Sequence, residues 1–263
     1  MKIKQYTSNL TTIEYQQLLV FLPVEITKKL KYSYHQILNG IFYIVKNGCT
    51  CRDMPNDLPP WETCYYHFRK FVVLELWERI KLELNKKVRR AIEGRKELPS
   101  CMLLDSQSVK NTDTGCKAGI DGNKKIKGIK KHLLTDTIGL NWNRVVTPAN
   151  VGDRAGAIQL AKTSKQKAIL KNCELVKADQ GYTGEDFAID FYMNCETIIE
   201  IVKKVEDQIG FQILPLRWVV ERSNAWMDKC RRMWKNCERL KESAEAIIDI
   251  CFIRINLKKL FGS

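Results

Sequence analysis

Apolar residues recur at helical spacing through the first part of the chain. Ile37, Ile41 and Ile44 lie three or four positions apart, as residues on one face of a helix do. Thr11 and Ser33 each stand just before such a segment and have Glu or Gln three positions later. This is the capping-box pattern of a helix N-terminus, so the pattern predicts several short helices.

A longer helix is expected after two consecutive prolines. Pro59 and Pro60 stand where a helix can begin, and the segment from Tyr65 to Leu84 continues it. Gly48 and Pro55 separate the helices that come before. A set of short helices fits a helix-turn-helix-like DNA reader. It fits a helical cap or a dimerisation module at least as well.

The pattern changes near residue 97. Residues 94–99 (GRKELP) have the composition of a linker, and the basic run 86–90 (KKVRR) precedes them. We therefore expect a small all-α domain over residues 1–97 and a second domain over residues 98–263.

Strand patterns and helix patterns alternate in the second domain. Strands are expected at 101–105, 124–135, 140–147, 175–178 and 197–202. Helices are expected at 153–168, at 185–194 and from residue 216 onward. An early strand meander followed by alternation predicts an α/β fold, in which helices flank a mixed sheet.

Composition adds a basic charge and excludes several classes of protein. The 263 residues are 44% hydrophobic, which is enough for a buried core, and the formal net charge is +14. Such a surplus attracts polyanions, although solvated surface lysines explain it equally well. The 10 cysteines and 3 histidines form no zinc-binding spacing. Without a signal peptide or a membrane-length apolar run, a cytoplasmic protein with reduced cysteines is expected.

Three acidic residues are the candidate chemical groups. Asp105 and Asp179 each stand where an apolar strand becomes polar, and Glu221 stands on the polar face of the last helical segment. Ligands collect near strand ends in open α/β sheets. The alternatives are aspartates that cap turns and a solvated helix face with Arg–Glu pairs.

Carboxylates of this kind suit a hard divalent cation. Mg²⁺ and Mn²⁺ prefer carboxylate and water oxygens, and two such ions together promote in-line phosphodiester displacement. The sequence carries no Ser-His-Asp or Cys-His signature of a protein nucleophile. The glycines of residues 119–123 lack the spacing of a phosphate-binding loop.

The motifs around these acids resemble a known family. In order they are DSQSVK (105–110), GIKKHLLTD (128–136), DQGYTG (179–184) and RWVVER (217–222), with LPPWETCYYHF (58–68) before them. The set resembles bacterial insertion-sequence transposases of the DDE type, most closely the insertion sequence five branch. The resemblance covers residues 13 to 240, and the ordered set is more specific than any one motif.

The resemblance implies a ribonuclease-H-like catalytic fold and a reaction. Asp105, Asp179 and Glu221 are then the catalytic and metal-binding residues, with two Mg²⁺ or Mn²⁺ ions. Similar enzymes bind the terminal inverted repeats of an element, hydrolyse the phosphodiester there and join the freed 3′-hydroxyl to target DNA. The implied partners are double-stranded DNA and further copies of the chain, as a homodimer or higher assembly. The implied location is the bacterial cytoplasm, at the nucleoid when DNA is bound.

The sequence departs from the family pattern around the glutamate. Leu214 and Asp228 stand where relatives carry Tyr and Lys, which leaves Lys229 or Arg232 as substitutes for the lysine. Asp179 and Glu221 are 42 positions apart, so no large insertion separates these two acids. The catalytic domain is expected to be compact.

Basic residues near the acids are expected to contact DNA phosphates without reading sequence. They are Lys124, Lys125, Lys127, Lys130, Lys131, Arg217, Lys229 and Arg232. For each of them an ordinary solvated side chain is the alternative. For the whole chain the alternatives are a metal-dependent nuclease or resolvase and a catalytically inactive, DNA-binding derivative of a transposase.

Overall fold

The computed structural model describes residues 5–23, 30–202 and 215–262. Its contacts group the chain into two compact units. We call residues 1–88, 227–234 and 246–263 the helical unit, and residues 89–226 and 235–245 the sheet unit. The last two helices each contribute residues to both units.

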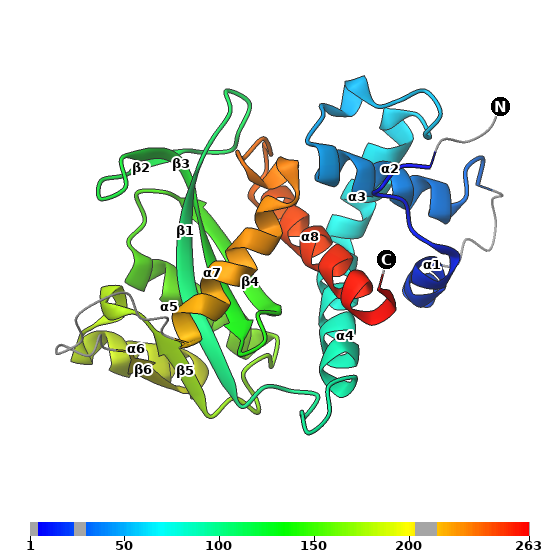
Figure 1. The fold of residues 1–263 in the computed structure, drawn as a ribbon. Coiled ribbons are helices and arrows are strands. Elements are labelled where there is room, and N and C mark those ends of the chain that lie inside the picture. The colour runs from blue at the N-terminus through cyan, green and yellow to red at the C-terminus, as the bar shows by residue number, and fades with distance from the viewer. Residues whose placement is uncertain (1–4, 24–29, 203–214, 263) are drawn as a thin grey trace. The chain divides into compact units, whose positions relative to one another are not determined.

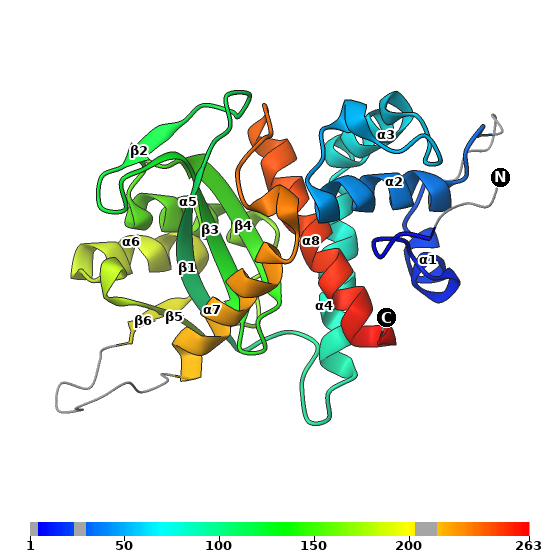
Figure 2. The ribbon, with the colours of Figure 1, turned by 45° about the horizontal axis from the view of Figure 1, so that its top comes forward.

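Helices and strands are distributed between the units as the sequence pattern predicts in outline (Figures 1 and 2). The α-helices are α1 (Thr12–Leu19), α2 (Tyr34–Asn47), α3 (Trp61–Val73), α4 (Leu76–Arg90), α5 (Asp153–Gln166), α6 (Glu185–Cys195), α7 (Pro215–Asp228) and α8 (Lys241–Phe261). The strands are β1 (Cys101–Lys110), β2 (Gly119–Asp121), β3 (Ile126–Asp136), β4 (Asn141–Pro148), β5 (Leu175–Ala178) and β6 (Ile198–Ile201).

The helical unit confirms both predicted N-termini. Thr11 caps α1 and Ser33 caps α2, each with its complete capping box. The single helix expected from Tyr65 to Leu84 is wrong, because the chain breaks between α3 and α4. Glu75 adopts a left-handed conformation there (φ 51°), and Trp77 after the break donates to the Phe68 carbonyl at 3.3 Å. The break lets the apolar residues on both sides enter one core.

The end of the chain belongs to the helical unit through buried polar pairs. Lys81 of α4 and Asp249 of α8 form a fully buried ion pair with an N–O distance of 2.9 Å. Asn256 of α8 donates to Asn85 of α4 at 2.7 Å. Contacts therefore group residues 246–263 with the N-terminal helices, although the division expected at residue 97 assigned them to the second domain. Partners so distant in sequence leave no periodic signal.

The sheet unit contains a mixed six-stranded sheet, so the predicted α/β class is confirmed. The strand order is β2-β3-β1-β5-β6, with β4 also paired to β3. Strands β1 and β3 are antiparallel, and so are β3 and β4, whereas β5 and β6 run parallel to β1. The meander and the later strands lie where the sequence predicts them. The short strand β2 lies in residues 119–123, for which the sequence pattern predicted no strand.

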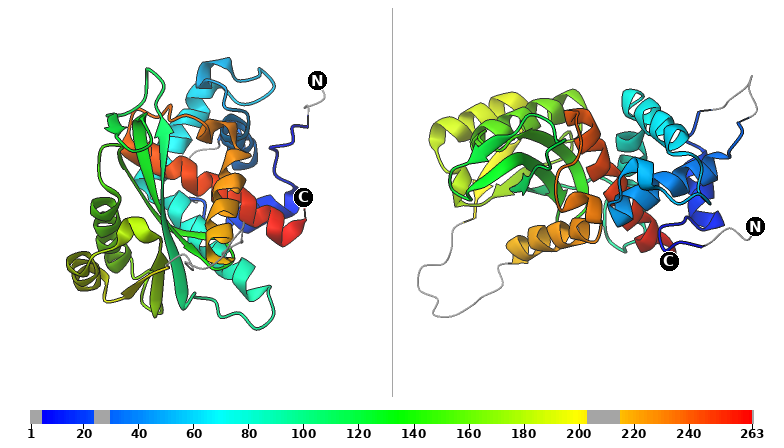
Figure 3. Two further views of the ribbon diagram at one scale, coloured as in Figure 1. Left: turned by 60° about the vertical axis from the view of Figure 1, so that its left-hand side comes forward. Right: turned by 90° about the horizontal axis from the view of Figure 1, so that it is seen from above.

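Helices cover both faces of this sheet. Helices α5 and α6 lie on one face and α7 lies on the other (Figure 3). Neighbouring residues of β1 point to opposite faces. Ser106 accordingly donates to Asp153 of α5, whereas Asp105 accepts from Asn224 of α7. The sheet therefore presents Asp105 on the side of α7.

Helix α5 packs closely on β3 at a glycine. A Cβ atom at Gly156 would collide with the ring of His132, which is fully buried. Burial lowers the pKa of His132 to about 4, so the imidazole is neutral at physiological pH. Its Nε2 atom lies 3.0 Å from the Thr147 hydroxyl. His132 is therefore a packing residue between two strands and a helix.

In the described ranges, no helix is long and apolar enough to cross a membrane.

Candidate active site

Asp105 in the middle of β1 and Asp179 just after β5 lie opposite each other on two neighbouring parallel strands. The sequence pattern placed Asp105 at the end of a strand, but β1 continues to Lys110. Cys101 of β1 pairs with Leu175 of β5, and Leu103 pairs with Lys177, each 74 positions later. Asp105 and Asp179 are also 74 positions apart, so the register continued by two residues sets them opposite each other. Opposite residues of adjacent strands share one face, with backbones about 4.8 Å apart. The two carboxylates therefore share one site.

The electrostatics of Asp105 reflect this arrangement. Burial raises the pKa of Asp105, and the negative charge of Asp179 raises it further. Hydrogen bonds from Asn224 and from the Ser106 backbone, together with the Lys124 ammonium, oppose the rise. Asp179 is exposed, and its Oδ1 atom accepts from the Gly181 amide at 3.0 Å. A cation between the two acids would relieve their repulsion.

Tyr182 lies beside the same acids. Its side chain is buried, and burial, followed by the charge of Asp105, raises its pKa well above the ordinary value. The charges of Asp153 and Asp179 act in the same direction. The phenol therefore remains neutral and forms part of the wall beneath the acid pair.

Glu221 is on α7, as predicted, but it does not complete a cluster. The residue is exposed and lies one helical turn before Asn224, the α7 residue that contacts Asp105. Residues three apart on a helix share a face, so Glu221 is on the Asp105 side of α7. Within residues 5–23, 30–202 and 215–262, no three His, Cys, Asp or Glu side chains gather closely enough to hold a metal ion.

Helix α7 is anchored to the turn between β3 and β4. The Ser223 hydroxyl donates to the Gly139 carbonyl at 3.0 Å, and Arg222 donates to the Ile138 carbonyl at 3.2 Å. Gly139 has φ 85°, and a Cβ atom there would lie 2.7 Å from the Ser223 hydroxyl. The close approach of helix and turn therefore depends on glycine at this position.

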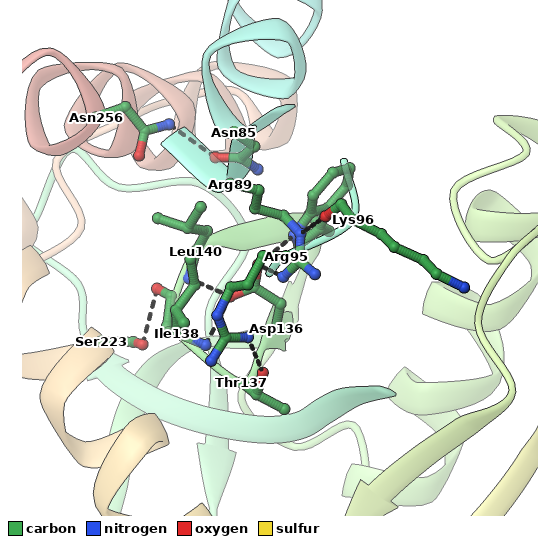
Figure 4. A network of polar contacts seen from close by, with 12 residues as sticks. Asn85, Arg89, Arg95, Lys96, Asp136, Thr137, Ile138, Leu140, Ser223 and Asn256 are labelled. Carbon is green, nitrogen blue, oxygen red and sulfur yellow. Dashed lines mark hydrogen bonds and ion pairs between the residues drawn. The ribbon is translucent and has the colours of Figure 1, made fainter. Parts of the chain in front are cut away.

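The turn itself is built around a buried carboxylate (Figure 4). Asp136 forms an ion pair with Arg89 at 2.8 Å and accepts from the Trp142 indole at 3.1 Å. Its other oxygen accepts from the backbone amides of Ile138 and Leu140, each at 3.0 Å. Asp136 thus holds the conformation of the turn on which α7 packs. The sequence shows Asp136 only as a turn residue, because its partner Arg89 is 47 positions away.

Three of the expected DNA-binding lysines surround the β2–β3 turn and are exposed. Lys125 is in the turn, Lys127 is on β3, and Lys124 reaches the Ser106 carbonyl at 3.4 Å. The charge of Lys124 lowers the pKa of Asp105, which places this ammonium group near the acid pair. An exposed cation beside two acids is a suitable contact for a DNA phosphate.

Lys130 and Lys131 are buried, so the expectation that they contact DNA is wrong for this structure. The ammonium of Lys130 lies 2.8 Å from Asp153 and 3.5 Å from Asp121. Lys130 thus contacts α5 through Asp153, and both lysines are less than 6% exposed. The run of lysines in the sequence gives no indication of this burial.

The network around Lys130 is the part of the site that the sequence did not reveal. Ser108 donates to Asp121 at 2.5 Å and lowers the pKa of Asp121 to about 2. Although burial alone would raise the pKa of Asp153, hydrogen bonds from Lys130 and Ser106 hold it below the usual value. The alternation of serines with Asp105 along β1 was the available signal.

Lys229 and Arg232 are not on the helix that carries Glu221, where the sequence pattern placed them. Helix α7 ends at Asp228, so Lys229 and Arg232 lie beyond it, in the helical unit. The Trp234 indole donates to the Asp228 carbonyl at 2.6 Å, and Lys46 donates to the Lys229 carbonyl at 2.8 Å. These bonds satisfy carbonyls at the helix end. The Arg217 side chain and Leu214 lie outside the described residues.

The donor chemistry of the site fits a hard divalent cation. Two carboxylates share one face, and a third is one helical turn from a residue that contacts the first. Oxygen donors of this type are those that Mg²⁺ and Mn²⁺ prefer. Asp105, Asp179 and Glu221 are the residues that would hold such an ion.

Comparison with known proteins gives the family. Residues 96–257 match the model of the "Transposase DDE domain", and residues 10–81 match that of the "Putative transposase of IS4/5 family". The "Putative transposase for insertion sequence element IS402" of Burkholderia cepacia is 29% identical over 117 residues. That alignment covers 43% of this chain and 54% of the relative, so the chain spans about half the length of the curated protein it matches. No solved structure matches.

The first match covers more than half of the chain and includes all three acids. Domains of this family have a ribonuclease-H-like fold and generally use divalent metal ions. The mixed sheet, with β1 between an antiparallel meander and two parallel strands, agrees with that fold. The chain belongs to the DDE transposase family.

Proposed function

We propose that this transposase binds the terminal inverted repeats of its insertion sequence, cleaves the DNA there and joins the freed ends to target DNA. The observation that carries the proposal is the register of β1 and β5, by which Asp105 and Asp179 share one face. In a DDE transposase, two adjacent carboxylates on neighbouring parallel strands are suited to bind a catalytic cation. We further propose Mg²⁺ or Mn²⁺, two ions per site, with Glu221 as the third ligand.

The chain's own residues hold and orient the reactants. Bound cations would stabilise the charge that develops on the attacking and leaving oxygens of a phosphodiester. Asp105 and Asp179 fix their position from the sheet, and Glu221 approaches from α7. The exposed Lys124, Lys125 and Lys127 are oriented to hold the DNA backbone beside the acids. Each such phosphate contact makes binding weaker at higher salt, by roughly 0.9 log units per log unit of salt.

Two displacements then complete the reaction without a covalent enzyme intermediate. In the first, a water oxygen forms a bond to the phosphorus at the element's end. The bond to the 3′-oxygen breaks, the attacking water gives up a proton to solvent, and the leaving 3′-oxygen takes up a proton to become a 3′-hydroxyl. In the second, this hydroxyl loses its proton and attacks a target phosphodiester, whose own 3′-oxygen leaves. Assembly of two or more chains would be needed to hold two ends together.

The proposal is tested by cleavage and joining of a duplex that carries one element end, with Mg²⁺ or Mn²⁺ present. Asp105→Ala, Asp179→Ala and Glu221→Ala are each expected to lower both rates by at least about 10³-fold. Asp190→Ala is the matched control, because Asp190 is exposed on α6 and accepts from Asn194 in the same helix. Near-normal cleavage by any of the three acid variants would remove that residue from the proposal.

The wild-type products also discriminate between the alternatives. Cleavage followed by joining supports the proposed transposition reaction. Cleavage without joining, under conditions where the second displacement is permitted, indicates a metal-dependent nuclease or resolvase. Binding of end DNA without cleavage indicates a catalytically inactive derivative.

A further inference from the structure

Asn224 connects helix α7 to the first acid of the site. Its side-chain amide Nδ2 donates to Oδ2 of Asp105 at 3.2 Å, across 119 positions of sequence. An amide nitrogen, and not its oxygen, faces a carboxylate favourably, so the contact fixes the orientation of the Asn224 side chain. Asn224 engages Oδ2 of Asp105 from α7, and the Ser106 backbone amide is a second donor to this carboxylate.

Helix α7 is held in a fixed position relative to β1, so that Asn224 reaches Asp105. Ser223 is bonded to the Gly139 carbonyl, and its hydroxyl also lies 2.9 Å from the Val219 carbonyl one turn earlier. The next residue, Asn224, projects toward β1. Because Gly139 and Ser223 permit close approach, a short side chain such as asparagine is long enough to reach Asp105.

The stability of the fold does not explain an asparagine at this position. The Oδ1 atom of Asn224 is buried and has no hydrogen-bond partner in the described residues. A buried acceptor without a partner destabilises the folded state, whereas leucine has a similar volume and no polar group to bury. The only benefit visible for the amide is its contact with Asp105.

We propose that Asn224 is a positioning residue for Asp105 in cation binding. This inference rests on the proposed function of Asp105 as a metal ligand. Asn224 holds one carboxylate oxygen from α7, so that the other oxygen stays directed to the site shared with Asp179. The same contact links β1 to α7, the helix that carries Glu221. It keeps Glu221 one helical turn away from the residue that contacts Asp105.

The test measures Mn²⁺ binding, cleavage and stability on the full chain. For Asn224→Leu, the affinity for Mn²⁺, measured by calorimetry, is expected to fall about 10–100-fold. The Mn²⁺ concentration that gives half-maximal cleavage should rise by the same factor, with a smaller change in the rate at saturating Mn²⁺. The urea midpoint of unfolding should be equal to that of the wild type or higher. Asn224→Ala serves if the leucine variant does not fold.

Asn194→Leu is the matched control, because Asn194 is also a helical asparagine but bonds only to Asp190 in the contacts found for its amide. It should bind Mn²⁺ as the wild type does. Wild-type Mn²⁺ affinity in both Asn224 variants would overturn the inference. A loss of Mn²⁺ affinity that only matches a loss of folded protein would also overturn the inference.

Asp105→Ala in the same calorimetric assay separates this inference from the proposed function. If Asp105→Ala abolishes Mn²⁺ binding and the Asn224 variants do not weaken it, the positioning role is wrong and the metal site stands. If Asp105→Ala binds Mn²⁺ normally, the proposed metal site itself is wrong.

Discussion

Two lysines of strand β3 have opposite environments. Lys127 is exposed, whereas Lys130, three positions later, is buried between two aspartates. The sequence predicted the strand and its charge, but not the contact of Lys130 with Asp153 of α5. Every residue of β3 from Gly128 to Asp136 is buried. The alternation of side chains between the two faces of this strand therefore does not indicate which lysines reach solvent. The three acids were chosen from the order of motifs along the chain, which is a local signal, and their role as ligands stays a prediction.

Removal of Lys130 should destabilise the protein. Lys130→Met leaves the buried Asp121 and half-buried Asp153 without their cation, and loss of one partner of a buried pair costs about 3–5 kcal/mol. The free energy of unfolding in urea is the measurement. Lys127→Met, an exposed lysine of the same strand, should change it by less than about 0.5 kcal/mol. Equal effects of the two substitutions would contradict the assigned burial.

Asp121 should make the stability of the fold depend on pH in the acidic range. Its pKa in the folded protein is about 2, below the ordinary value of about 3.9. A lowered pKa stabilises the fold above pH 4, and that stabilisation is lost as pH falls from about 4 to 2. Asp121→Asn should therefore be less stable than the wild type at pH 7, by on the order of 2 kcal/mol. The difference should shrink in urea titrations as pH approaches 2, and a constant difference would refute the assignment.

Helix α7 shows how far an element can be predicted from its sequence. The polar face with Glu221 was predicted, and the helix exists. The end of α7 at Asp228 and its packing on the β3–β4 turn were not predicted, because both depend on partners distant in sequence. The same reason explains the missed break between α3 and α4, where tertiary packing overrides helical periodicity.

The packing of α7 on the β3–β4 turn should be sensitive to substitution of Gly139. Gly139→Ala puts a Cβ atom against Ser223 and Trp226 and forces alanine into a left-handed conformation. We expect lower stability, by about 1–3 kcal/mol, and faster amide hydrogen exchange in α7. Gly122→Ala, where a Cβ atom meets no other atom within 4 Å, is the matched control. Unchanged exchange in α7 would show that the turn does not hold the helix.

At the scale of the whole molecule, the order of motifs along the chain was the strongest signal. It predicted the family and the fold class, both of which the structure and the family matches support. The grouping of residues 246–263 with the N-terminal helices could not be predicted, since it depends on pairs such as Lys81 and Asp249. Local sequence predicts elements, whereas buried polar pairs decide which elements share a core.

At the scale of the whole molecule, the proposed function requires that Asp105, Asp179 and Glu221 of α7 surround one divalent-metal site. Fe²⁺ in place of Mg²⁺, with peroxide and ascorbate, generates radicals that cut the backbone close to the bound ion. We expect cuts near residues 105 and 179 and in α7 around residues 221–224. Excess Mg²⁺ should suppress them, and Asp105→Ala should abolish them. Cuts elsewhere that survive both excess Mg²⁺ and Asp105→Ala, with none at these three segments, would contradict the account.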